Sequence, residues 1–258
     1  TYDKGDIRIF GKQMKADSYD LKQQIGVVPQ NVAVFHELSV EDNINYFCGL
    51  YVSDKAKRKT LVDEAIRFVS LEEFRKFRPG KLSGGLLRRL NIACGIAHQP
   101  KLIFMDEPTV AVDPQSRNAI LEGIRRLNAQ GATIVYTSHY MEEVEEICSR
   151  IIIIDKGKTI AAGSKEELKA GIMMKEKIEV EQVKLHEQQV RDIQDIANVF
   201  SVQYNANVLQ VKFTEGKRNL ANLLDYFTQE NITYGKVYSQ QPTLNDVFLE
   251  ITGKQLRD

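Results

Sequence analysis

Short apolar runs recur along this chain and set the strongest limit on its fold. Runs of four or five residues lie at 25–28, 102–105, 133–137 and 151–154, and helical patterns separate them. The runs are short and rich in β-branched residues, which indicates strands. Strands that are apolar on both faces and alternate with helices are typical of a largely parallel sheet. The sequence therefore predicts an α/β fold for the first part of the chain.

A helical insertion is expected between the first two of these strands, at about residues 31–100. One amphipathic helix is predicted to begin after Ser39, with Asp42 placed to complete a capping box. A second helix is indicated by apolar residues at helical spacing, namely Leu61, Ala65, Ile66 and Val69.

The order of predicted strands and helices changes after a capping-box helix predicted at 164–167. Strand and helix patterns then occur in the order βαββαβ, which is the split pattern of a ferredoxin-like unit. Eight apolar residues are predicted to face inward, and they are Ile178, Val180, Val190, Ile193, Val211, Phe213, Leu223 and Phe227. The predicted elements are strand 177–183, helix 187–199, strands 200–204 and 208–213, helix 217–229, strand 232–238 and a last helix 243–252. We therefore expect an α/β domain at 1–170 and a small α+β domain at 171–258.

Composition limits the classes of function. The chain of 258 residues has 35 basic and 35 acidic residues, which gives no electrostatic reason to expect nucleic acid as a partner. Its three scattered cysteines suit a reducing compartment better than a disulfide framework or a metal site. No stretch approaches the roughly 18 apolar residues of a spanning helix, so any membrane contact is expected to come through a partner.

Two carboxylates come directly after the apolar run at 102–105. Asp106 and Glu107 are placed at the carboxyl end of a predicted parallel strand, where open α/β sheets bind ligands. An aspartate in this place can hold Mg²⁺, and a second carboxylate can orient or deprotonate an attacking water. The alternative is that both side chains merely cap a solvated turn.

Polar side chains come after the neighbouring strands in the same way. His139 lies just beyond the run at 133–137, where an imidazole could contact a terminal phosphate and the water that attacks it. Gln30 lies just beyond the run at 25–28 and could ligate a hard cation or its water. Each residue alone would be unremarkable, but with Asp113 they form an ordered set of metal, phosphate and water ligands.

The stretch LSGGLLRRL at 82–90 places Ser83, Gly84 and Gly85 directly before a helix. Unpaired amides at a helix N-terminus favour phosphate, and glycine lets the backbone approach it closely. The stretch therefore predicts an anion site without a charged side chain, and a plain serine-capped helix is the alternative.

Four stretches, VVPQN, LSGGLLRRL, LIFMDEPTVAVDP and TSHYMEE, occur in this order. They resemble the Q-loop, signature, Walker B with D-loop, and H-loop of ATP-binding cassette (ABC) transporter ATPases, over roughly residues 1–165. The tail PTLNDVFLEITGKQLRD is similar to the end of ATPase subunits of ABC-2-type, drug-resistance-like exporters. The resemblance implies a core like that of P-loop nucleotide hydrolases.

The resemblance also implies roles and partners. Glu107 would be the catalytic base, His139 would sense the γ-phosphate, and Asp106 with Gln30 would serve Mg²⁺. Ser83, Gly84 and Gly85 would cover the γ-phosphate of ATP held by a second cassette, in a homodimer or a heterodimer, and Asp113 would take part in binding ATP. Gln30 and the helical insertion would face an ABC-2-type membrane permease, which would place the chain at the inner face of the cell membrane.

One family motif, the phosphate loop GxxxxGK[ST], does not occur in the 258 residues. Its place is expected upstream of Thr1, since the strand expected at 7–10 matches the segment that comes after that loop in the family. Gly157-Lys158-Thr159 has the loop's ending, but Ile152 stands where its first glycine belongs. Ala111, where the family prefers glycine, and Leu86-Leu87, where polar residues are usual, are smaller departures. A non-catalytic or truncated cassette, which only binds the permease or donates its signature, is the alternative function.

Overall fold

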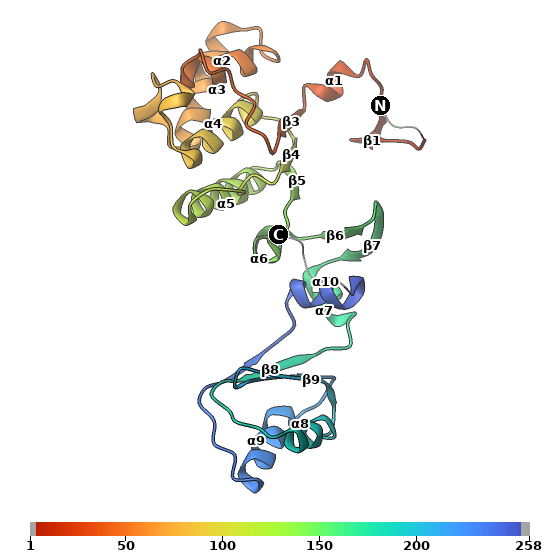
Figure 1. The fold of residues 1–258 in the computed structure, drawn as a ribbon. Helices are drawn as coiled ribbons and strands as arrows, with labels where there is room; N and C mark the ends of the chain where they lie inside the picture. The colour runs from red at the N-terminus through yellow and green to blue at the C-terminus, as the bar shows by residue number, and fades with distance from the viewer. Residues whose placement is uncertain (1–3, 254–258) are drawn as a thin grey trace. The chain divides into compact units, whose positions relative to one another are not determined.

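The computed structural model describes residues 4–253 and divides into two compact units, residues 1–143 and 144–258 (Figure 1). The place expected for the phosphate loop, upstream of Thr1, and the last five residues of the tail motif lie outside the described residues.

The first unit contains a short hairpin, a parallel sheet and several helices. Its strands are β1 (Arg8–Ile9), β2 (Lys12–Gln13), β3 (Ile25–Val28), β4 (Leu102–Asp106) and β5 (Thr133–Thr137). Its helices are α1 (Tyr19–Lys22), α2 (Val40–Gly49), α3 (Lys55–Phe68), α4 (Gly84–Ile96) and α5 (Pro114–Ala129), with 3-10 turns at Glu72–Phe74 and Pro79–Lys81. Helix α6 (Met141–Ile147) crosses the boundary between the units.

The strand predicted at 7–10 is shorter in the structure. Only Arg8 and Ile9 form β1, which pairs antiparallel with β2. Phe10 and Gly11 have φ values of 52° and 76°, so they turn the chain into a tight hairpin instead of extending the strand.

A three-stranded parallel sheet in the order β3-β4-β5 forms the centre of the first unit. The predicted runs at 25–28, 102–105 and 133–137 all lie in it, which confirms the parallel sheet. Because parallel strands end at the same edge, the loops after β3, β4 and β5 emerge together.

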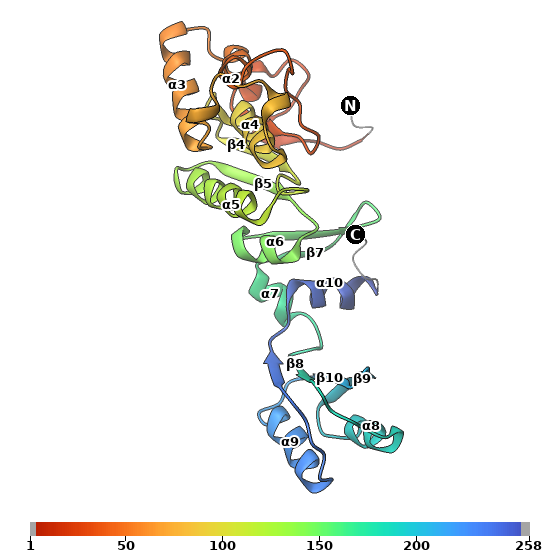
Figure 2. The same cartoon turned by 60° about the vertical axis from the view of Figure 1, so that its left-hand side comes forward.

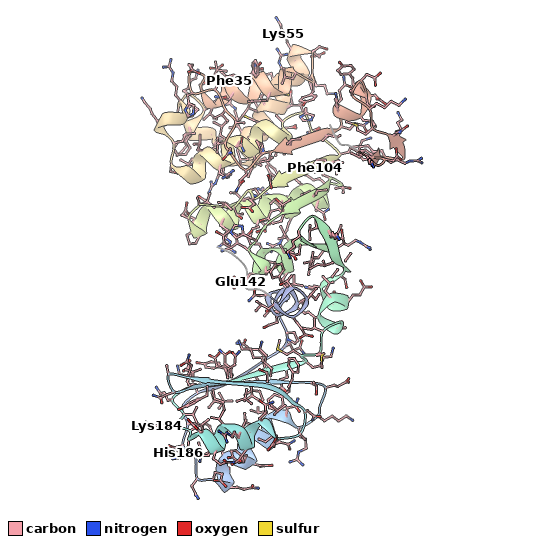
Figure 3. The ribbon with its side chains drawn as sticks, turned by 45° about the vertical axis from the view of Figure 1, so that its right-hand side comes forward. Phe35, Lys55, Phe104, Glu142, Lys184 and His186 are labelled. Atoms are coloured by element: carbon pink, nitrogen blue, oxygen red, sulfur yellow. The ribbon has the colours of Figure 1, made fainter. Side chains whose placement is uncertain are left out.

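The two faces of this sheet differ. Val28, Ile103 and Met105 are buried on the face where α4 packs against β3 and α5 against β5. Val27, Phe104 and Val135, which are paired in register on the other face, are 59%, 37% and 42% exposed. Phe104 is labelled in Figure 3. The prediction that these strands are buried on both faces was therefore wrong, because the described chain leaves this face uncovered at all three positions.

Strand β3 and helix α4 approach each other through two glycines. A Cβ atom on Gly26 would lie 2.5 Å from the carbonyl oxygen of Gly95, and one on Gly95 would lie 2.7 Å from the carbonyl oxygen of Val27. These distances are too short for any side chain, so the contact between strand and helix depends on glycine at both positions.

Gly95→Ala is expected to lower the free energy of unfolding by about 1–3 kcal/mol, because the new methyl group forces strand and helix apart. This loss opposes the roughly 1 kcal/mol by which alanine normally favours a helix over glycine. Urea unfolding of the chain measures the change, and Gly80→Ala, where a Cβ meets no atom within 4 Å, is the matched control. An unfolding midpoint for Gly95→Ala at or above that of the parent would contradict the close approach.

Helices α2, α3 and α4 pack together and confirm the predicted helical insertion (Figure 2). Ser39 caps α2, and its hydroxyl accepts a hydrogen bond from the Asp42 amide at 3.2 Å. The Asp42 carboxylate accepts from the Ser39 hydroxyl and not from the Ser39 amide, so the reciprocal half of the predicted capping box is absent here.

After the last residues of α6, the second unit continues with a β-hairpin, and its last described helix packs on the helix that follows this hairpin. Its strands are β6 (Ile151–Asp155), β7 (Lys158–Gly163), β8 (Glu176–Val180), β9 (Val199–Asn205), β10 (Val208–Phe213) and β11 (Val237–Gln240). Its helices are α7 (Lys165–Ala170), α8 (Glu187–Gln194), α9 (Asn219–Gln229) and α10 (Leu244–Thr252). The capping box predicted for Ser164 and Glu167 is present at the start of α7.

The apolar run at 151–154 forms β6, which pairs antiparallel with β7. Ile152 and Ile154 are 58% and 61% exposed, so the prediction that this strand is buried on both faces of a parallel sheet was wrong. Gly157, with φ of 74°, lies in the hairpin turn, and Lys158 and Thr159 begin β7. The triplet that imitates the phosphate loop therefore opens no helix, as its context predicts.

The remaining strands form an antiparallel sheet in the order β11-β8-β10-β9, with α8 and α9 on one face (Figures 1 and 2). This is the ferredoxin-like α+β arrangement that the sequence predicts. Seven of the eight inward residues are fully buried in its core, whereas Val190 is only partly buried. Helix α8 ends at Gln194, five residues before its predicted end, and β11 begins at Val237, later than predicted. The domain boundary at 170/171 stays a prediction.

No helix within the described residues 4–253 combines the length and the apolar character that crossing a membrane requires.

Candidate functional site

The carboxyl ends of β3, β4 and β5 and the loops after them carry four of the predicted site residues. Gln30 lies two residues after β3, Asp106 ends β4 with Glu107 directly behind it, and His139 lies two residues after β5. The shared edge of the parallel sheet brings these loops side by side.

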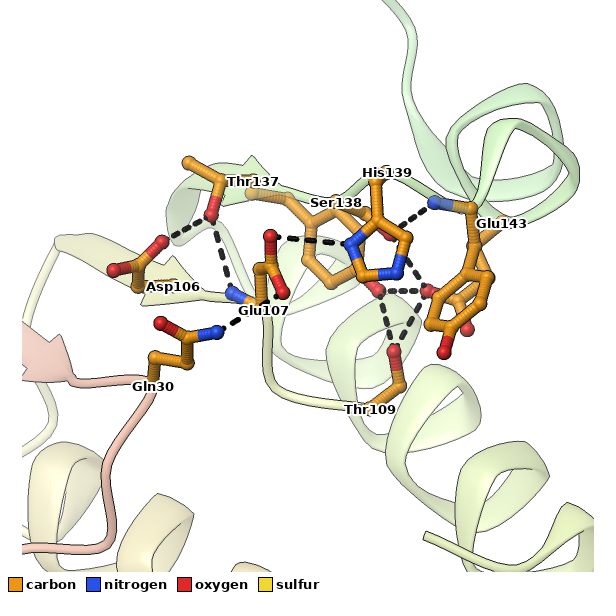
Figure 4. Close-up of polar contacts among 10 residues, drawn as sticks. Gln30, Asp106, Glu107, Thr109, Thr137, Ser138, His139 and Glu143 are labelled. Carbon is orange, nitrogen blue, oxygen red and sulfur yellow. Dashed lines mark hydrogen bonds and ion pairs between the residues drawn. The ribbon is translucent and has the colours of Figure 1, made fainter. Parts of the chain in front are cut away.

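Glu107 is the centre of this group. The Gln30 amide Nε2 donates a hydrogen bond to Glu107 Oε2 at 3.2 Å, and His139 Nδ1 lies 3.2 Å from Glu107 Oε1 (Figure 4). The side chains of Glu107 and His139 are 25% and 37% exposed, so ligands and water can reach them. The Glu107 carboxylate, which Gln30 and His139 contact from distant parts of the sequence, is therefore an accessible group that can accept a proton.

Thr137 joins the two carboxylates. Its hydroxyl donates to Asp106 Oδ1 at 2.5 Å and accepts a hydrogen bond from the Glu107 amide at 3.1 Å (Figure 4). Glu107 has φ of 44°, an uncommon conformation for a residue with a side chain. The backbone of Glu107 is thus held by Thr137, whose role the sequence patterns did not reveal.

The donor set of this edge suits a hard cation. No cluster of three or more histidine, cysteine or acidic side chains able to hold a metal occurs within residues 4–253. Mg²⁺ usually takes one or two protein oxygens and completes its shell with water and substrate phosphate, so the Asp106 carboxylate and the side-chain amide oxygen of Gln30 fit an ion that arrives with a nucleotide.

The signature stretch opens α4 as predicted. Ser83 is the N-cap residue, and its hydroxyl accepts a hydrogen bond from the Leu86 amide at 3.3 Å. Gly84 is exposed, whereas Gly85 is buried, and a Cβ on Gly85 would lie 2.2 Å from Ser116 Oγ. Helix capping is therefore one role of Ser83, and close packing against α5 requires glycine at position 85.

Asp113 and Ala111 lie next to the signature stretch. Asp113 caps α5 through a hydrogen bond of 2.9 Å from the Ser116 amide to Oδ1, and this hydrogen bond lowers its pKa. Ala111 has φ of 59°, a conformation that costs a residue with a side chain roughly 1–2 kcal/mol and that glycine adopts freely. This conformation gives a physical reason for glycine at the corresponding place in the family that the motifs resemble.

Two residues of α4 that no sequence pattern singled out hold the loop after β3. Arg88 is 8% exposed, and its guanidinium donates to the carbonyl oxygen of Gln30 at 2.5 Å. Burial without a carboxylate partner lowers the pKa of Arg88. The Asn91 side chain donates to the carbonyl oxygen of Pro29 at 3.0 Å. The helix that begins with the signature therefore also positions Gln30.

A buried carboxylate, Glu143 in α6, lies behind this edge and accepts hydrogen bonds from Thr109 and Ser138, which lie in the loops of Glu107 and His139. Sequence reasoning missed it because an acidic residue in the acidic stretch MEEVEE resembles a solvated helix face. The structure thus brings Gln30, Asp106, Glu107 and His139 together, and it places Asp113 beside Gly85 in a second group.

Family models match both parts of the chain. The model described as "ABC transporter" matches residues 1–110, and the model described as "ATP-binding protein DrrA1-3-like, C-terminal domain" matches residues 163–252.

Curated relatives extend over nearly the whole chain. The linearmycin resistance ATP-binding protein of Bacillus subtilis (strain 168) is 36% identical, over 100% of this chain and 83% of the relative. A Nod factor export ATP-binding protein of Rhizobium sp. (strain N33) is 32% identical, over 98% of this chain and 81% of the relative.

Solved structures share the fold. An ATP-binding subunit of an ABC transporter aligns with a TM-score of 0.58 at 24% identity, over 65% of this chain and 70% of that structure. A dimeric ATP-binding cassette with ADP and phosphate bound aligns with a TM-score of 0.57 at 24% identity, over 62% of this chain and 73% of that structure. From its motifs, its site geometry and these relatives, the chain belongs to the ATP-binding proteins of ABC transporters.

Proposed function

We propose that this chain is the ATP-binding and ATP-hydrolysing subunit of an ABC-2-type exporter and works in a dimer of cassettes against a separate membrane permease. The observation that carries the proposal is the contact of Glu107 with both Gln30 and His139 at the open edge of the parallel sheet. A carboxylate held in this way can orient a water molecule and take a proton from it as the water attacks a phosphate.

The neighbouring residues have distinct roles in this proposal. His139 lies against Glu107 and contacts the γ-phosphate and the attacking water through its imidazole. Asp106, which Thr137 holds by a hydrogen bond, and Gln30 are the residues that would hold Mg²⁺. When bound, Mg²⁺ neutralises charge that develops on the phosphate oxygens.

The signature surface acts on the partner cassette. Ser83 and the amides of Gly84 and Gly85 open a helix, whose first amides have no acceptor within the helix and whose dipole favours an anion. We infer that they cover the γ-phosphate of ATP bound by the other cassette, with Asp113 at the same interface. That second cassette is either an identical chain or a related one.

The permease is the proposed membrane partner. The named relatives serve linearmycin resistance and Nod factor export, which supports an export role for this chain, of the multidrug kind. Arg88 and Asn91 tie the loop that carries Gln30 to the signature helix, so a movement of that loop against the permease can reach the ATP site. The chain would then sit on the cytoplasmic face of the membrane.

The alternative is a cassette that only binds the permease or donates its signature in trans. The phosphate loop GxxxxGK[ST] does not occur in these 258 residues. The lysine and amides of that loop hold the β- and γ-phosphates. We therefore expect weak ATP binding and no hydrolysis by the 258-residue chain alone.

Phosphate release in vesicles that contain the permease tests the proposal. The chain with a phosphate loop supplied at its N-terminus is expected to hydrolyse ATP, and Lys→Ala in that loop is the control that abolishes it. Binding to the permease without any hydrolysis by the loop-bearing version would favour the non-catalytic alternative.

A further inference from the structure

Glu143 is a fully buried carboxylate with four polar partners from other segments of the first unit. Its Oε2 atom accepts hydrogen bonds from the hydroxyls of Thr109 at 2.8 Å, Ser138 at 3.3 Å and Tyr136. Its Oε1 atom lies 2.5 Å from Arg117 Nε as an ion pair that lacks hydrogen-bond alignment. Figure 4 shows Glu143 between the loops after β4 and β5.

The partners of Glu143 flank the proposed catalytic residues. Thr109 lies two residues after Glu107, and Ser138 directly precedes His139. Tyr136 precedes Thr137, whose hydroxyl holds Asp106 and the Glu107 amide. One oxygen atom of Glu143 therefore joins the loop of Glu107 to the loop of His139.

A buried carboxylate is a costly way to join two loops, since well-packed apolar residues often stabilise a fold as well or better. A charged acceptor, however, makes stronger and more directional hydrogen bonds than a neutral one. Burial and the neighbouring Glu143 raise the pKa of Tyr136, so its hydroxyl stays protonated and donates. The hydrogen bonds around Glu143 are thus better suited to fixing the positions of the two loops than to stabilising the fold.

We propose that Glu143 is a positioning residue for ATP hydrolysis, which fixes the distance between Glu107 and His139 by holding Thr109 and Ser138 on one carboxylate oxygen. Glu143 touches neither nucleotide nor water in this role, and it acts through the two loops. The inference rests on the proposed function of Glu107 and His139.

The first test needs no nucleotide. Amide hydrogen exchange of the 258-residue chain is compared with that of Glu143→Gln, which keeps the side-chain shape but removes the charge and leaves Arg117 unpaired. Exchange at 107–111 and 138–140 is expected to speed up by about tenfold, with the rates in α2 and α3 unchanged. Glu142→Gln, at the exposed neighbouring position of α6, is the matched control and should leave all rates as in the parent (Figure 3).

The second test separates positioning from a purely structural role. In the version that carries a phosphate loop, Glu143→Ala is expected to lower kcat by about 10²-fold and Glu143→Gln by about tenfold, with the KM for ATP within twofold of the parent. A purely structural residue would lower the unfolding midpoint but leave kcat per folded molecule unchanged. If Glu143→Ala does not fold, Glu143→Gln decides.

Either of two results overturns the inference: folded Glu143 variants with the parent's kcat, or unchanged exchange at both loops in Glu143→Gln. A parent that binds the permease but hydrolyses no ATP instead refutes the proposed function, and the exchange experiment then still tests whether Glu143 holds the two loops.

Discussion

Glu107→Gln is expected to keep ATP binding and to slow ATP turnover by about 10²-fold or more, in the version of the chain that carries a phosphate loop. The amide has the shape of the carboxylate and can still contact Gln30 and His139, which lie 3.2 Å from its two oxygens. It cannot accept a proton from water at neutral pH. The substitution therefore removes the proposed base and leaves the shape of the site.

Two measurements check this result together. Equilibrium binding of ATP should match the parent within about threefold, while single-turnover phosphate release falls. Glu73→Gln, a charge-matched change at an exposed glutamate away from the site, should change neither. Near-parent turnover by a folded Glu107→Gln protein would remove Glu107 from the role of base.

Ser83→Arg is expected to abolish the ability of this chain to complete an ATP site on a partner cassette. The partner for this experiment carries a phosphate loop but has its own signature serine disabled, so its hydrolysis depends on the signature supplied in trans. The 258-residue chain should restore phosphate release. An arginine at the exposed position 83 fills the space that the γ-phosphate would enter and also removes the cap of α4.

A second N-cap serine separates these two effects of the arginine. Ser164 caps α7, so Ser164→Arg loses a comparable helix cap, worth about 0.5–2 kcal/mol, without changing the signature. Mixed dimers are first verified by size and by cross-linking for both variants. Equal phosphate release with Ser83→Arg and with the parent would leave Ser83 as a helix cap and nothing more.

The spacing of apolar residues and the capping residues at helix starts were enough to predict most of the helices and strands. The apolar runs predicted β3, β4 and β5, and Ser39 and Ser164 marked the starts of α2 and α7. These signals are local, because a strand or a helix cap is encoded within a few neighbouring residues. The ferredoxin-like order of the second unit was predicted by the same rules.

Local sequence patterns could not predict which faces of the strands are buried. Val27, Phe104 and Val135 are as apolar as buried strand residues, yet they are exposed in the structure. An apolar side chain indicates only that its burial would be favourable. Whether a helix or strand covers it depends on contacts between residues that are distant in sequence.

The residues of the site also fall into two groups, those that local sequence patterns predict and those that they do not. Gln30, Asp106, Glu107 and His139 each lie at the end of a predicted strand, so the rule that ligands bind at the carboxyl ends of parallel strands was sufficient to predict that they lie together. Glu143 reaches the loop of Glu107 through Thr109, which lies 34 residues away in the chain, and Arg88 holds the backbone of Gln30, which lies 58 residues away. Their roles depend on geometry, since nothing in the neighbouring residues distinguishes them from an ordinary helix face.

The uncovered face of the parallel sheet bears on how folding of this chain can be assayed. Environment-sensitive dyes such as anilinonaphthalene sulfonate fluoresce on exposed apolar surface, and their signal is commonly taken as a mark of partly folded protein. Val27, Phe104 and Val135 offer such a surface in the folded chain. Dye fluorescence is therefore a poor criterion of misfolding here, and near-ultraviolet circular dichroism, which reports fixed packing around aromatic side chains, is the sounder choice.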